Sequence, residues 1–368
     1  MTPGSFLRDR PDASDAAAAR GRMREDASPA PSSGRVLVTT LVPQQKTAWT
    51  KARADVLQLL RAAGWHVVAL PDGLNPVGWC QALADITRLA GAGGQVLIEY
   101  PFEQRKRTYL LHMACRARGA RLHALLHDLD SLRHADSPVS RELDVLQLFD
   151  GLVSHNPAMT LWLREQGYGR KVVNLNLFDY CGPQAPPCHE KAIRSPLKVV
   201  FAGNLSYPKA RYMYDPRVTQ LPGVELSLYG AFFEPERVAG GQLRYMGAFD
   251  PDRPALDGRY HFGLVWDGTS IEGCQGNYGE YTRYNNPHKL SLYMALGLPV
   301  IAWRQAAIAP FVVDRRVGVL VDDLREIGDL AATVGTGAYL AMAANAARLG
   351  EKARRGEFLL DAVTRIAR

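Results

Sequence analysis

Short apolar runs alternate with amphipathic stretches of helical length along the sequence from Arg35 onward. A bounded apolar run of about four to eight residues fits a buried strand, and a longer stretch with helical periodicity fits a helix that covers it. This alternation is typical of βαβ units, in which parallel strands are joined by covering helices. The sequence therefore predicts an α/β protein with mostly parallel sheets.

The first series of elements predicts one complete doubly wound domain, at residues 35–180. We expect its strands at Val36–Leu41, His66–Leu70, Gln95–Tyr100, Leu122–Leu126, Gly151–Ser154 and Val172–Leu175. We expect its helices near residues 48–63, 77–90, 104–118, 140–148 and 157–166.

A second α/β series follows residues 181–196, which are rich in turn formers and predict a linker. Its strands are expected at Lys198–Ala202, Glu225–Leu228, Arg244–Met246, Phe262–Trp266, Pro299–Trp303 and Gly318–Val321. The Ala-rich end near residues 329–366 predicts two helices. We therefore expect a second domain at 197–350 and a terminal helix at 351–368 that leans back on the first domain.

Residues 1–34 mix Arg and Asp with Ala, Ser and Pro and lack the apolar core of a secretory signal. They predict a disordered leader, and the default compartment is the cytoplasm. No run approaches the roughly 18 apolar residues of a membrane-spanning helix. The five cysteines are scattered without a C-x-x-C pair, so no metal site is expected.

The formal net charge of +7 favours an anionic partner. No nucleic-acid-binding motif accompanies it, which leaves phosphorylated small molecules or an anionic membrane face. The expected helix at 104–118 mixes basic with apolar residues: Arg105, Lys106, Arg107, Tyr109, Leu110, Leu111, Met113, Arg116 and Arg118. This helix either rests on an anionic leaflet or simply presents a solvated charged face.

The clearest local signal is a helix start at residues 285–291. Asn286 is expected to cap the helix, with Pro287 in its first position. The unpaired N–H groups and positive dipole of a helix N-terminus hold phosphate, and Lys289 and Ser291 would add a cation and a donor. The alternative is a well-capped surface helix whose lysine is solvated.

Two further strand ends are expected at the same sheet edge. Gly203 and Asn204 end the first strand of the second domain, and Lys209 follows; these residues suit a phosphate, although a strand ending in Gly-Asn is often only a turn. Tyr229 could face a nucleobase or pack in the core. Glu280 is expected to bind ribose hydroxyls.

The stretch from Phe262 to Ile301, with Gly276-Asn277-Tyr278-Gly279-Glu280-Tyr281 and Asn285-Asn286-Pro287-His288-Lys289, resembles bacterial β-1,6-galactofuranosyltransferases. It resembles, more distantly, the streptococcal glucosyltransferases that extend GlcNAc on serine-rich adhesins. The likeness extends from Arg35 to about Leu330 and includes His127-Asp128-Leu129-Asp130.

The resemblance implies a GT-B glycosyltransferase: two Rossmann-like domains facing a central cleft, a UDP-sugar held by the second, a glycan acceptor bound by the first, and no cofactor or metal. Residues that match the family's nucleotide site are Gly203, Asn204, Tyr229, Asn286, Lys289 and Ser291.

Inverting transfer requires a base opposite the leaving group. Asp128 is the first candidate and His127 the second, because both follow a strand of the first domain. Asp128 could instead cap its loop, or pair with Asp130 as a metal-binding Asp-x-Asp. Glu99 and Glu103 are expected either to bind acceptor hydroxyls or to form a solvated pair.

Together with these candidate residues, the resemblance implies an inverting, metal-independent transferase that uses UDP-galactofuranose to extend a surface polysaccharide. UDP-glucose is the alternative donor, and a non-catalytic nucleotide-sugar sensor is the alternative from another class. A lipid-linked acceptor would bring the enzyme to the inner face of the membrane. Homo-oligomer formation is left open.

Overall fold

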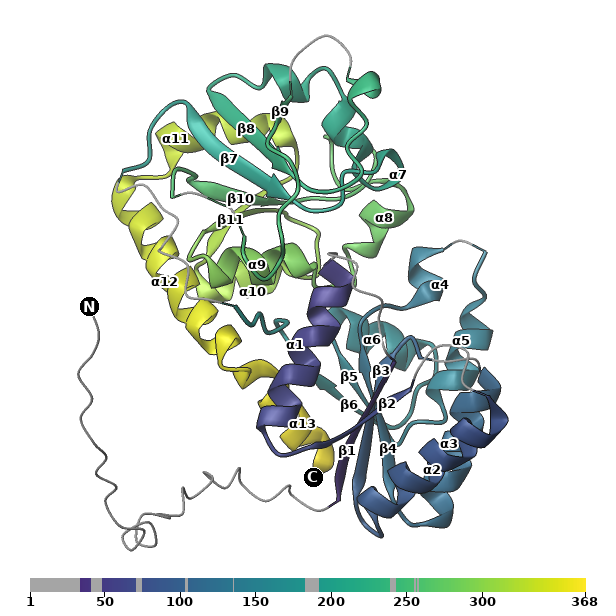
Figure 1. Ribbon diagram of the computed structural model, residues 1–368. Helices are drawn as coiled ribbons and strands as arrows, with labels where there is room; N and C mark the ends of the chain where they lie inside the picture. Colours follow the sequence, from purple (N-terminus) through teal and green to yellow (C-terminus); the bar gives the residue numbers. More distant parts are fainter. Residues whose placement is uncertain are drawn as a thin grey trace, which may run out of the picture.

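The structure, a computed structural model, describes residues 34–40, 48–70, 75–102, 105–134, 136–182, 192–238, 243–254, 256 and 258–368. These residues form two α/β domains, each built on a six-stranded parallel sheet (Figure 1). Residues 1–33, Glu103 and residues 183–191 lie outside the described residues, and with them the predicted leader and most of the predicted linker.

The first sheet has the strand order β2-β1-β3-β4-β5-β6. Its strands are β1 (Arg35–Thr40), β2 (His66–Leu70), β3 (Gln95–Tyr100), β4 (Arg121–Leu126), β5 (Gly151–Ser154) and β6 (Lys171–Asn174). The helices around it are α1 (Ala48–Ala62), α2 (Pro76–Ala90), α3 (Arg105–Ala117), α4 (Asp130–Arg133), α5 (Val139–Leu146) and α6 (Pro157–Glu165). All six predicted strands are confirmed; the short helix α4 was not predicted.

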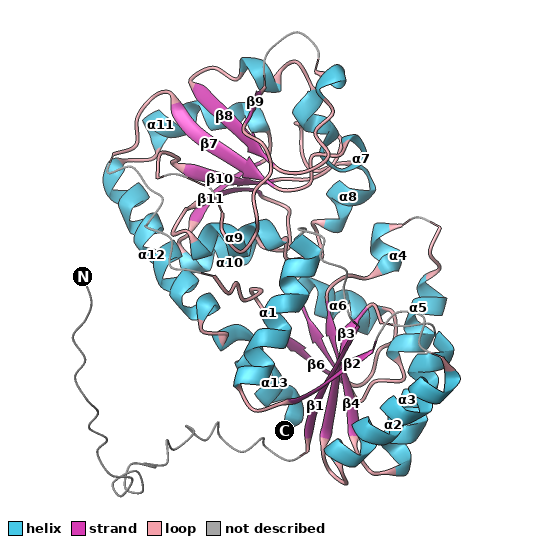
Figure 2. Ribbon diagram, in the orientation of Figure 1, coloured by secondary structure: helices cyan, strands magenta, loops and turns pink. Residues whose placement is uncertain are grey.

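The two faces of this sheet are covered by different helices (Figure 2). Val36 and Val38 of β1 face a cluster that contains buried residues of α2, α3, α5 and α6, whereas Leu37 faces α1 and the last helix of the chain. Because side chains alternate along a strand, β1 contributes to both cores. A strand covered on both faces has no polar face, and this explains the near-continuous apolar runs in the sequence.

The second sheet has the order β12-β11-β10-β7-β8-β9. Its strands are β7 (Leu197–Ala202), β8 (Val224–Tyr229), β9 (Arg244–Tyr245), β10 (Phe262–Val265), β11 (Val300–Trp303) and β12 (Gly318–Val321). Its α-helices are α7 (Tyr207–Ala210), α8 (Gly276–Tyr281), α9 (His288–Ala295), α10 (Ala309–Arg315), α11 (Leu330–Thr333) and α12 (Thr336–Arg354). Short 3₁₀ turns occupy Arg211–Tyr214, Val218–Gln220, Pro235–Arg237 and Leu324–Asp329. The six strands predicted for this domain are also confirmed.

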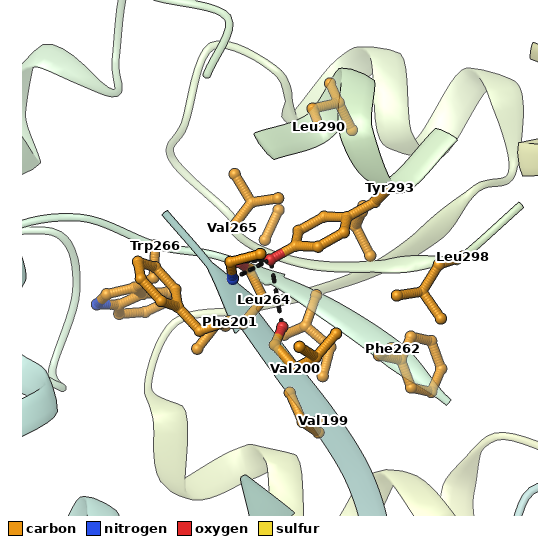
Figure 3. Packing of buried hydrophobic residues seen from close by; sticks show 14 of the residues in the cluster. Val199, Val200, Phe201, Phe262, Leu264, Val265, Trp266, Leu290, Tyr293 and Leu298 are labelled. Atoms are coloured by element: carbon orange, nitrogen blue, oxygen red, sulfur yellow. Dashed lines mark hydrogen bonds between the residues drawn. The ribbon is translucent and has the colours of Figure 1, made fainter. Parts of the chain in front are cut away.

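Helix α9 is fixed on the second sheet by Tyr293 (Figure 3). Its phenol accepts the N–H of Ala202 at 2.8 Å and lies 3.3 Å from the carbonyl oxygens of Val200 and Leu264. A Cβ atom at Gly263 would lie 2.5 Å from the Tyr293 ring, so glycine is required for the helix to approach the strand this closely. The start of α9 is thereby held at the carboxyl edge of the sheet.

The end of the chain crosses back to the first domain. Helix α12 packs on α9, and α13 (Glu357–Ala367) packs on β5 and β6. The Asp179 carboxylate accepts the Leu359 N–H at 2.7 Å near the start of α13. Arg365 donates to the carbonyl of Asn174 at the end of β6, at 2.7 Å. The last helix is therefore a part of the first domain's core.

Among the described residues, no single helix has both the length and the apolar character needed to cross a bilayer. Only the bent pair formed by Leu324–Thr333 and Thr336–Arg354 meets the two criteria when its members are taken together.

Candidate active site

A cavity of about 420 Å³ lies between the two domains. Its walls are residues that follow β4 and β5 in the first domain, residues at the ends of β7, β8 and β10 in the second, and the start of α9. In open parallel sheets this carboxyl edge is where ligands bind. The cavity is therefore the candidate active site, and it lies where the predicted cleft was expected.

Asp128 is the carboxylate that lines this cavity directly after β4. Its Oδ2 accepts from Arg133 Nη1 at 2.6 Å, and its Oδ1 accepts the phenol of Tyr281, in the second domain, at 3.2 Å. Burial raises the pKa of the Asp128 carboxyl above its ordinary value, although the Arg133 guanidinium opposes the rise. Asp128 is thus a partly buried carboxylate with a tuned proton affinity, which is what a general base needs.

His127 also lines the cavity, but its imidazole is occupied on the protein side. Its Nε2 lies 3.1 Å from Glu99 Oε1, and its ring stacks on Phe178 at 5.6 Å between centroids. Glu99 in turn accepts from Thr39 Oγ1 at 2.6 Å. This buried chain orients His127 from behind, whereas Arg133 and Tyr281, the partners of Asp128, themselves line the cavity.

The prediction that Glu99 binds acceptor hydroxyls or belongs to a solvated pair is not met by its surroundings. Glu99 is fully buried at the end of β3 and lies outside the cavity lining. The reason is that β3 is a central strand, so its last residues are covered by neighbours on both sides. Glu103, the other predicted acceptor residue, lies outside the described residues.

Glu142 on α5 holds the loop that carries Asp128. Its carboxylate accepts the N–H groups of Asp130 and Ser131, each at 2.9 Å, and the phenol of Tyr100 at 3.0 Å. Asp130 therefore begins the short helix α4, and the Asp-x-Asp pair is split, because only Asp128 lines the cavity. No local sequence pattern marks Glu142, since its partners lie in other elements.

Asn286 was predicted to cap α9, but the structure shows that it does not. Its side chain donates to the carbonyls of His155, at 2.7 Å, and Asn176, at 2.9 Å, and accepts from Asn156 at 2.8 Å. Its N–H donates to His155 Nδ1 at 3.0 Å. These three partners belong to the first domain, so Asn286 connects the two domains by hydrogen bonds. The helix begins one residue later than expected, after Pro287.

His155 is held neutral in this interdomain network. Its Nε2 lies 3.0 Å from the carbonyl oxygen of Leu126, so that nitrogen carries the proton and Nδ1 accepts from Asn286. Burial lowers the pKa of His155 to about 3. Burial likewise lowers the pKa of His288, at the start of α9, to about 3. His155 and His288 therefore add no imidazolium charge to the wall around the helix start at neutral pH.

Lys289 lines the cavity, as predicted for a phosphate-binding cation, but its ammonium is already paired within the protein. Its ammonium donates to Asp267 Oδ1 and to the carbonyl of Trp266, each at 2.9 Å, and lies 4.5 Å from the centre of the Phe201 ring. Burial lowers the pKa of this ammonium, and Asp267 opposes the shift. Lys289 and Asp267 together therefore present little net charge to a ligand.

Lys209 is the cation of the second domain that lines the cavity without a carboxylate partner among the described residues. Its ammonium lies 5.8 Å from the centre of the Tyr278 ring. Asn204 lies nearby along the lining and accepts the Ser206 N–H at 2.8 Å, which leaves its amide N–H groups for a ligand. Together with the N-terminus of α9, these groups form a wall whose chemistry suits an anion, called here the anion-binding wall.

The opposite part of the cavity lining consists of apolar side chains and small residues such as Gly230 and Ala231. Tyr229 lines it and packs against Phe249, and Gly230 accepts the phenol of Tyr245 at 2.9 Å. Phe232 is 61% exposed and takes a φ of 64°, which is uncommon for a residue with a side chain. Flat apolar surface of this kind suits a nucleobase or a sugar ring.

Two predicted nucleotide residues lie outside the cavity lining. Glu280 is exposed on α8 and accepts from Arg283 at 2.7 Å. Ser291 is buried on the side of α9 that faces the protein. In both cases the helix turns the side chain away, because a spacing of one or two residues changes the face that it occupies.

Arg133, Tyr278 and Tyr281 are lining residues that sequence reasoning did not select. Tyr281 follows Glu280 in helix α8, and successive residues of a helix point in different directions, so only Tyr281 reaches the cavity. Such residues can be identified from the sequence only when it is known which side of the helix faces the cavity.

Residues 35–177 match the N-terminal domain of the family described as glucosyltransferase 3-like, and residues 199–366 match its C-terminal domain. The beta-1,6-galactofuranosyltransferase WbbI of Escherichia coli (strain K12) is 32% identical over 249 residues, which cover 67% of this chain and 71% of that protein. Glucosyltransferase 3 of Streptococcus gordonii is 23% identical over 263 residues, which cover 67% of this chain and 72% of that protein.

Solved structures share the architecture at low sequence identity. The lipopolysaccharide outer core galactosyltransferase WaaB superposes with a TM-score of 0.57 at 8% identity, covering 90% of this chain and 99% of that one. An alpha-glucosyltransferase in complex with UDP and DNA gives 0.56 at 10% identity, covering 91% and 99%. Sucrose-phosphate synthase from Thermosynechococcus elongatus gives 0.52 at 15% identity, covering 90% and 96%. These likenesses show the GT-B fold.

Proposed function

Because the chain belongs to the glucosyltransferase 3-like family and is a glycosyltransferase of the GT-B fold, we propose that it transfers galactofuranose from UDP-galactofuranose to a glycan acceptor. The transfer inverts the anomeric centre and needs no metal. The observation that carries the proposal is the cavity itself, in which the Asp128 carboxylate of the first domain shares one space with the anion-binding wall of the second.

The nucleotide diphosphate occupies the anion-binding wall. The N-terminus of α9 offers backbone N–H groups and the positive end of its dipole, and Lys209 adds a cation. The uracil and ribose lie against the apolar lining around Tyr229, Gly230 and Phe232. A solved relative in fold is described in complex with UDP, which supports a uridine nucleotide as the donor.

Asp128 acts as the general base. It takes the proton of the acceptor hydroxyl while the hydroxyl oxygen forms a bond to the anomeric carbon of the donor. The bond from that carbon to the β-phosphate oxygen breaks on the opposite face, and its electron pair leaves with UDP. Attack opposite the leaving group inverts the anomeric configuration.

The leaving diphosphate gains negative charge as its bond to the sugar breaks. The helix N-terminus, Lys209 and the amide of Asn204 are positioned to stabilise this charge, and one such preorganised donor is typically worth on the order of 2.7–4 kcal/mol of barrier. These groups provide the stabilisation that a divalent cation supplies in metal-dependent transferases, and this supports metal-independent transfer.

The donor sugar is assigned from the relatives. The relative at 32% identity is named a galactofuranosyltransferase, and this supports UDP-galactofuranose. UDP-glucose is the second candidate, because the matching family and the relative at 23% identity are named glucosyltransferases. We further propose that the acceptor is a surface polysaccharide precursor, which places the reaction in the cytoplasm.

A screen of UDP-sugars tests the proposal. Purified protein is incubated with UDP-galactofuranose, UDP-galactopyranose or UDP-glucose and a glycan acceptor, with and without EDTA, and UDP release and the anomeric configuration of the product are measured. We expect UDP-galactofuranose to be the preferred donor, EDTA to have no effect, and the product to be inverted. Loss of activity in EDTA would overturn the metal-independent mechanism, and preference for UDP-glucose would replace the donor.

A further inference from the structure

Helix α3 carries an exposed apolar surface that the proposed reaction does not use. Tyr109, Leu110 and Met113 expose 52%, 48% and 48% of their surface, and their spacing makes them neighbours on one helix face. The opposite face packs on the first domain through Thr108, Leu111, His112 and Cys115. Single exposed apolar residues are ordinary, but three large ones side by side indicate an interaction surface.

The same segment is the most basic part of the chain. Residues 105–121 contain six basic and no acidic residues, so they account for six of the seven net positive charges of the protein. The basic residues are Arg105, Lys106, Arg107, Arg116, Arg118 and Arg121. Of these, Arg105 is paired with Asp144 of α5 at 3.0 Å, and Arg107 packs over the Trp79 ring.

The charges lie around the apolar residues. Lys106 and Arg116 are exposed on the same side of α3 as Tyr109 and Met113, one near each end of the helix. The arrangement is an apolar centre between basic ends. Basic side chains with long aliphatic stems can reach outward beside such a centre while their charged groups remain in contact with water or phosphate.

The surface lies on the outer side of the first domain and begins at the edge where the active site lies. Strands β3 and β4 are paired in parallel with Tyr100 opposite Leu126. Helix α3 starts shortly after β3, and Asp128 follows β4, so both leave the same edge of the sheet. Figure 1 shows α3 on the side of this domain remote from α13.

We propose that this surface of α3, defined by Lys106, Tyr109, Leu110, Met113 and Arg116, docks the protein on an anionic phospholipid bilayer. The three apolar side chains enter the interface between headgroups and acyl chains, and the basic residues contact lipid phosphates. A nucleic acid would be held by the charges alone and would leave the apolar centre exposed. Lipid satisfies both parts of the surface.

Docking through α3 would present the first domain's edge of the cavity toward a lipid-linked acceptor. The bilayer contact itself does not depend on the identity of the donor, so the two proposals can fail separately. Vesicle binding reports on the surface, and the affinity for UDP reports on the cavity.

Vesicle sedimentation tests the surface on the full chain. We compare vesicles of pure phosphatidylcholine with vesicles in which about one third of the lipid is phosphatidylglycerol, at low and at high salt. We expect binding to the anionic vesicles that weakens with salt, and little binding to the neutral ones. Absence of binding to the anionic vesicles, or equal binding to both, would overturn the proposal.

Two variants separate the parts of the surface. The triple variant Tyr109→Ser, Leu110→Ser, Met113→Ser removes the apolar centre, and the double variant Lys106→Glu, Arg116→Glu reverses the charge. Because each basic residue near the surface contributes about fivefold to partitioning, we expect each variant to bind anionic vesicles at least roughly tenfold more weakly. Both should bind UDP as the unchanged protein does, because none of these residues lines the cavity.

Matched controls use exposed residues elsewhere on the protein. Leu161, Val313 and Leu340 are exposed apolar residues on three other helices, and Arg61 and Arg315 are exposed basic residues on α1 and α10. Serine substitutions of the first three and glutamate substitutions of the last two should leave vesicle binding unchanged. Equal loss in the control and the α3 variants would overturn the assignment to α3.

Two competing occupants give distinct results. If duplex DNA binds with the same dependence on Lys106 and Arg116 and displaces the protein from vesicles, while Leu110→Ser has no effect, a nucleic-acid surface replaces the proposal. If the unchanged protein is a dimer and the triple variant a monomer by sedimentation equilibrium, α3 is instead an interface between copies of the chain.

Discussion

The phenol of Tyr281, in the second domain, donates to the carboxylate of Asp128, in the first, at 3.2 Å. The same phenol accepts the N–H of Leu129 at 3.2 Å. The proposed base is therefore oriented by a residue of the domain that we propose holds the donor. Any separation of the domains would break both contacts, so the base is fully assembled only when the cleft is closed.

The first prediction concerns Asp128 itself. Asp128→Asn keeps the size of the side chain but removes the proton acceptor, so we expect kcat to fall by a factor of about 10²–10⁴ while the Kd for UDP stays the same. Transfer assays and calorimetric titration with UDP measure the two quantities. Asp130→Asn is the control, because Asp130 lies outside the cavity lining, and it should retain turnover. Normal turnover in Asp128→Asn would remove Asp128 from the mechanism.

Tyr281→Phe tests the contact between the domains. The substitution removes both hydrogen bonds of the phenol, to Asp128 and from the Leu129 N–H. Loss of the bond to Asp128 is worth about 0.5–1.5 kcal/mol, so we expect kcat/KM to fall roughly three- to tenfold with little change in the Kd for UDP. Tyr284→Phe, in which the ring packs against Trp162, serves as the control and should behave as the unchanged protein. An equal effect of the two substitutions on kcat/KM would show that the phenol of Tyr281 has no special role.

Lys209 and Lys289 should respond differently to removal. Lys209→Ala should raise the Kd for UDP about tenfold and leave the Tm unchanged, since this lysine forms no close ion pair among the described residues. Lys289→Ala should raise the Kd several-fold and also destabilise the protein by about 3–5 kcal/mol, because it leaves the buried Asp267 unpaired.

The double variant Asp267→Asn, Lys289→Met distinguishes these two effects. It removes both charges, so we expect it to recover most of the stability that Lys289→Ala loses while UDP binding stays weak. Thermal unfolding and titration with UDP are the measurements. Recovery of both properties would mean that Lys289 acts on the fold and not on the nucleotide.

Stability should fall in mild acid because of His123. Burial lowers the pKa of His123 to about 4 in the folded protein, below the ordinary value of 6.5. As the pH falls from 6.5 toward 4, the unfolded chain binds a proton that the folded chain does not, so stability is lost by up to about 3 kcal/mol. Urea unfolding between about pH 7 and pH 4.5 should show a weaker pH dependence in His123→Leu than in the unchanged protein. Identical slopes would contradict the assignment.

Alanine substitutions at Gly230 and Gly337 should have opposite effects on the protein, because only Gly230 lacks space for a side chain. Gly230 has a φ of 149°, and a Cβ atom there would lie 1.7 Å from the carbonyl oxygen of Gly203. Gly230→Ala should therefore deform the cavity and weaken UDP binding at least tenfold. Gly337 lies in α12 with open space around it, so Gly337→Ala should stabilise the protein by about 0.4–1 kcal/mol. Thermal unfolding and titration with UDP are the measurements. Equal changes of the Tm and of the Kd for UDP in the two variants would contradict the prediction.

The fold could be predicted from the sequence because its signal is local. The strands of both sheets are covered on each side, so their apolar runs stand out, and caps such as Asn75 and Asn156 mark helix starts at the residues that follow them. The helix α4 escaped prediction because it is held by Glu142, which lies on another element.

The site could be predicted only to the level of its segments. The segments that carry Asp128, Asn204 and Lys209 reach the cavity as expected. The uses of Asn286 and Lys289 differ from expectation, because each is decided by a partner distant in sequence, His155 for one and Asp267 for the other. Capping preferences describe a helix alone, whereas here an opposing domain competes for the same amide.

The position of α13 has a consequence for biosynthesis. Its Leu359, Val363 and Ile366 complete a core with Leu37, Leu125 and Val153 of the first sheet, yet the ribosome makes them after the entire second domain. During translation this face of the first sheet is therefore covered only in part, by α1, and the amino-terminal half reaches its final packing only when α13 emerges. Premature termination just before Glu357 would yield a chain whose incomplete first-domain core is accessible to chaperones or proteases, even though every residue that lines the cavity had already been synthesised.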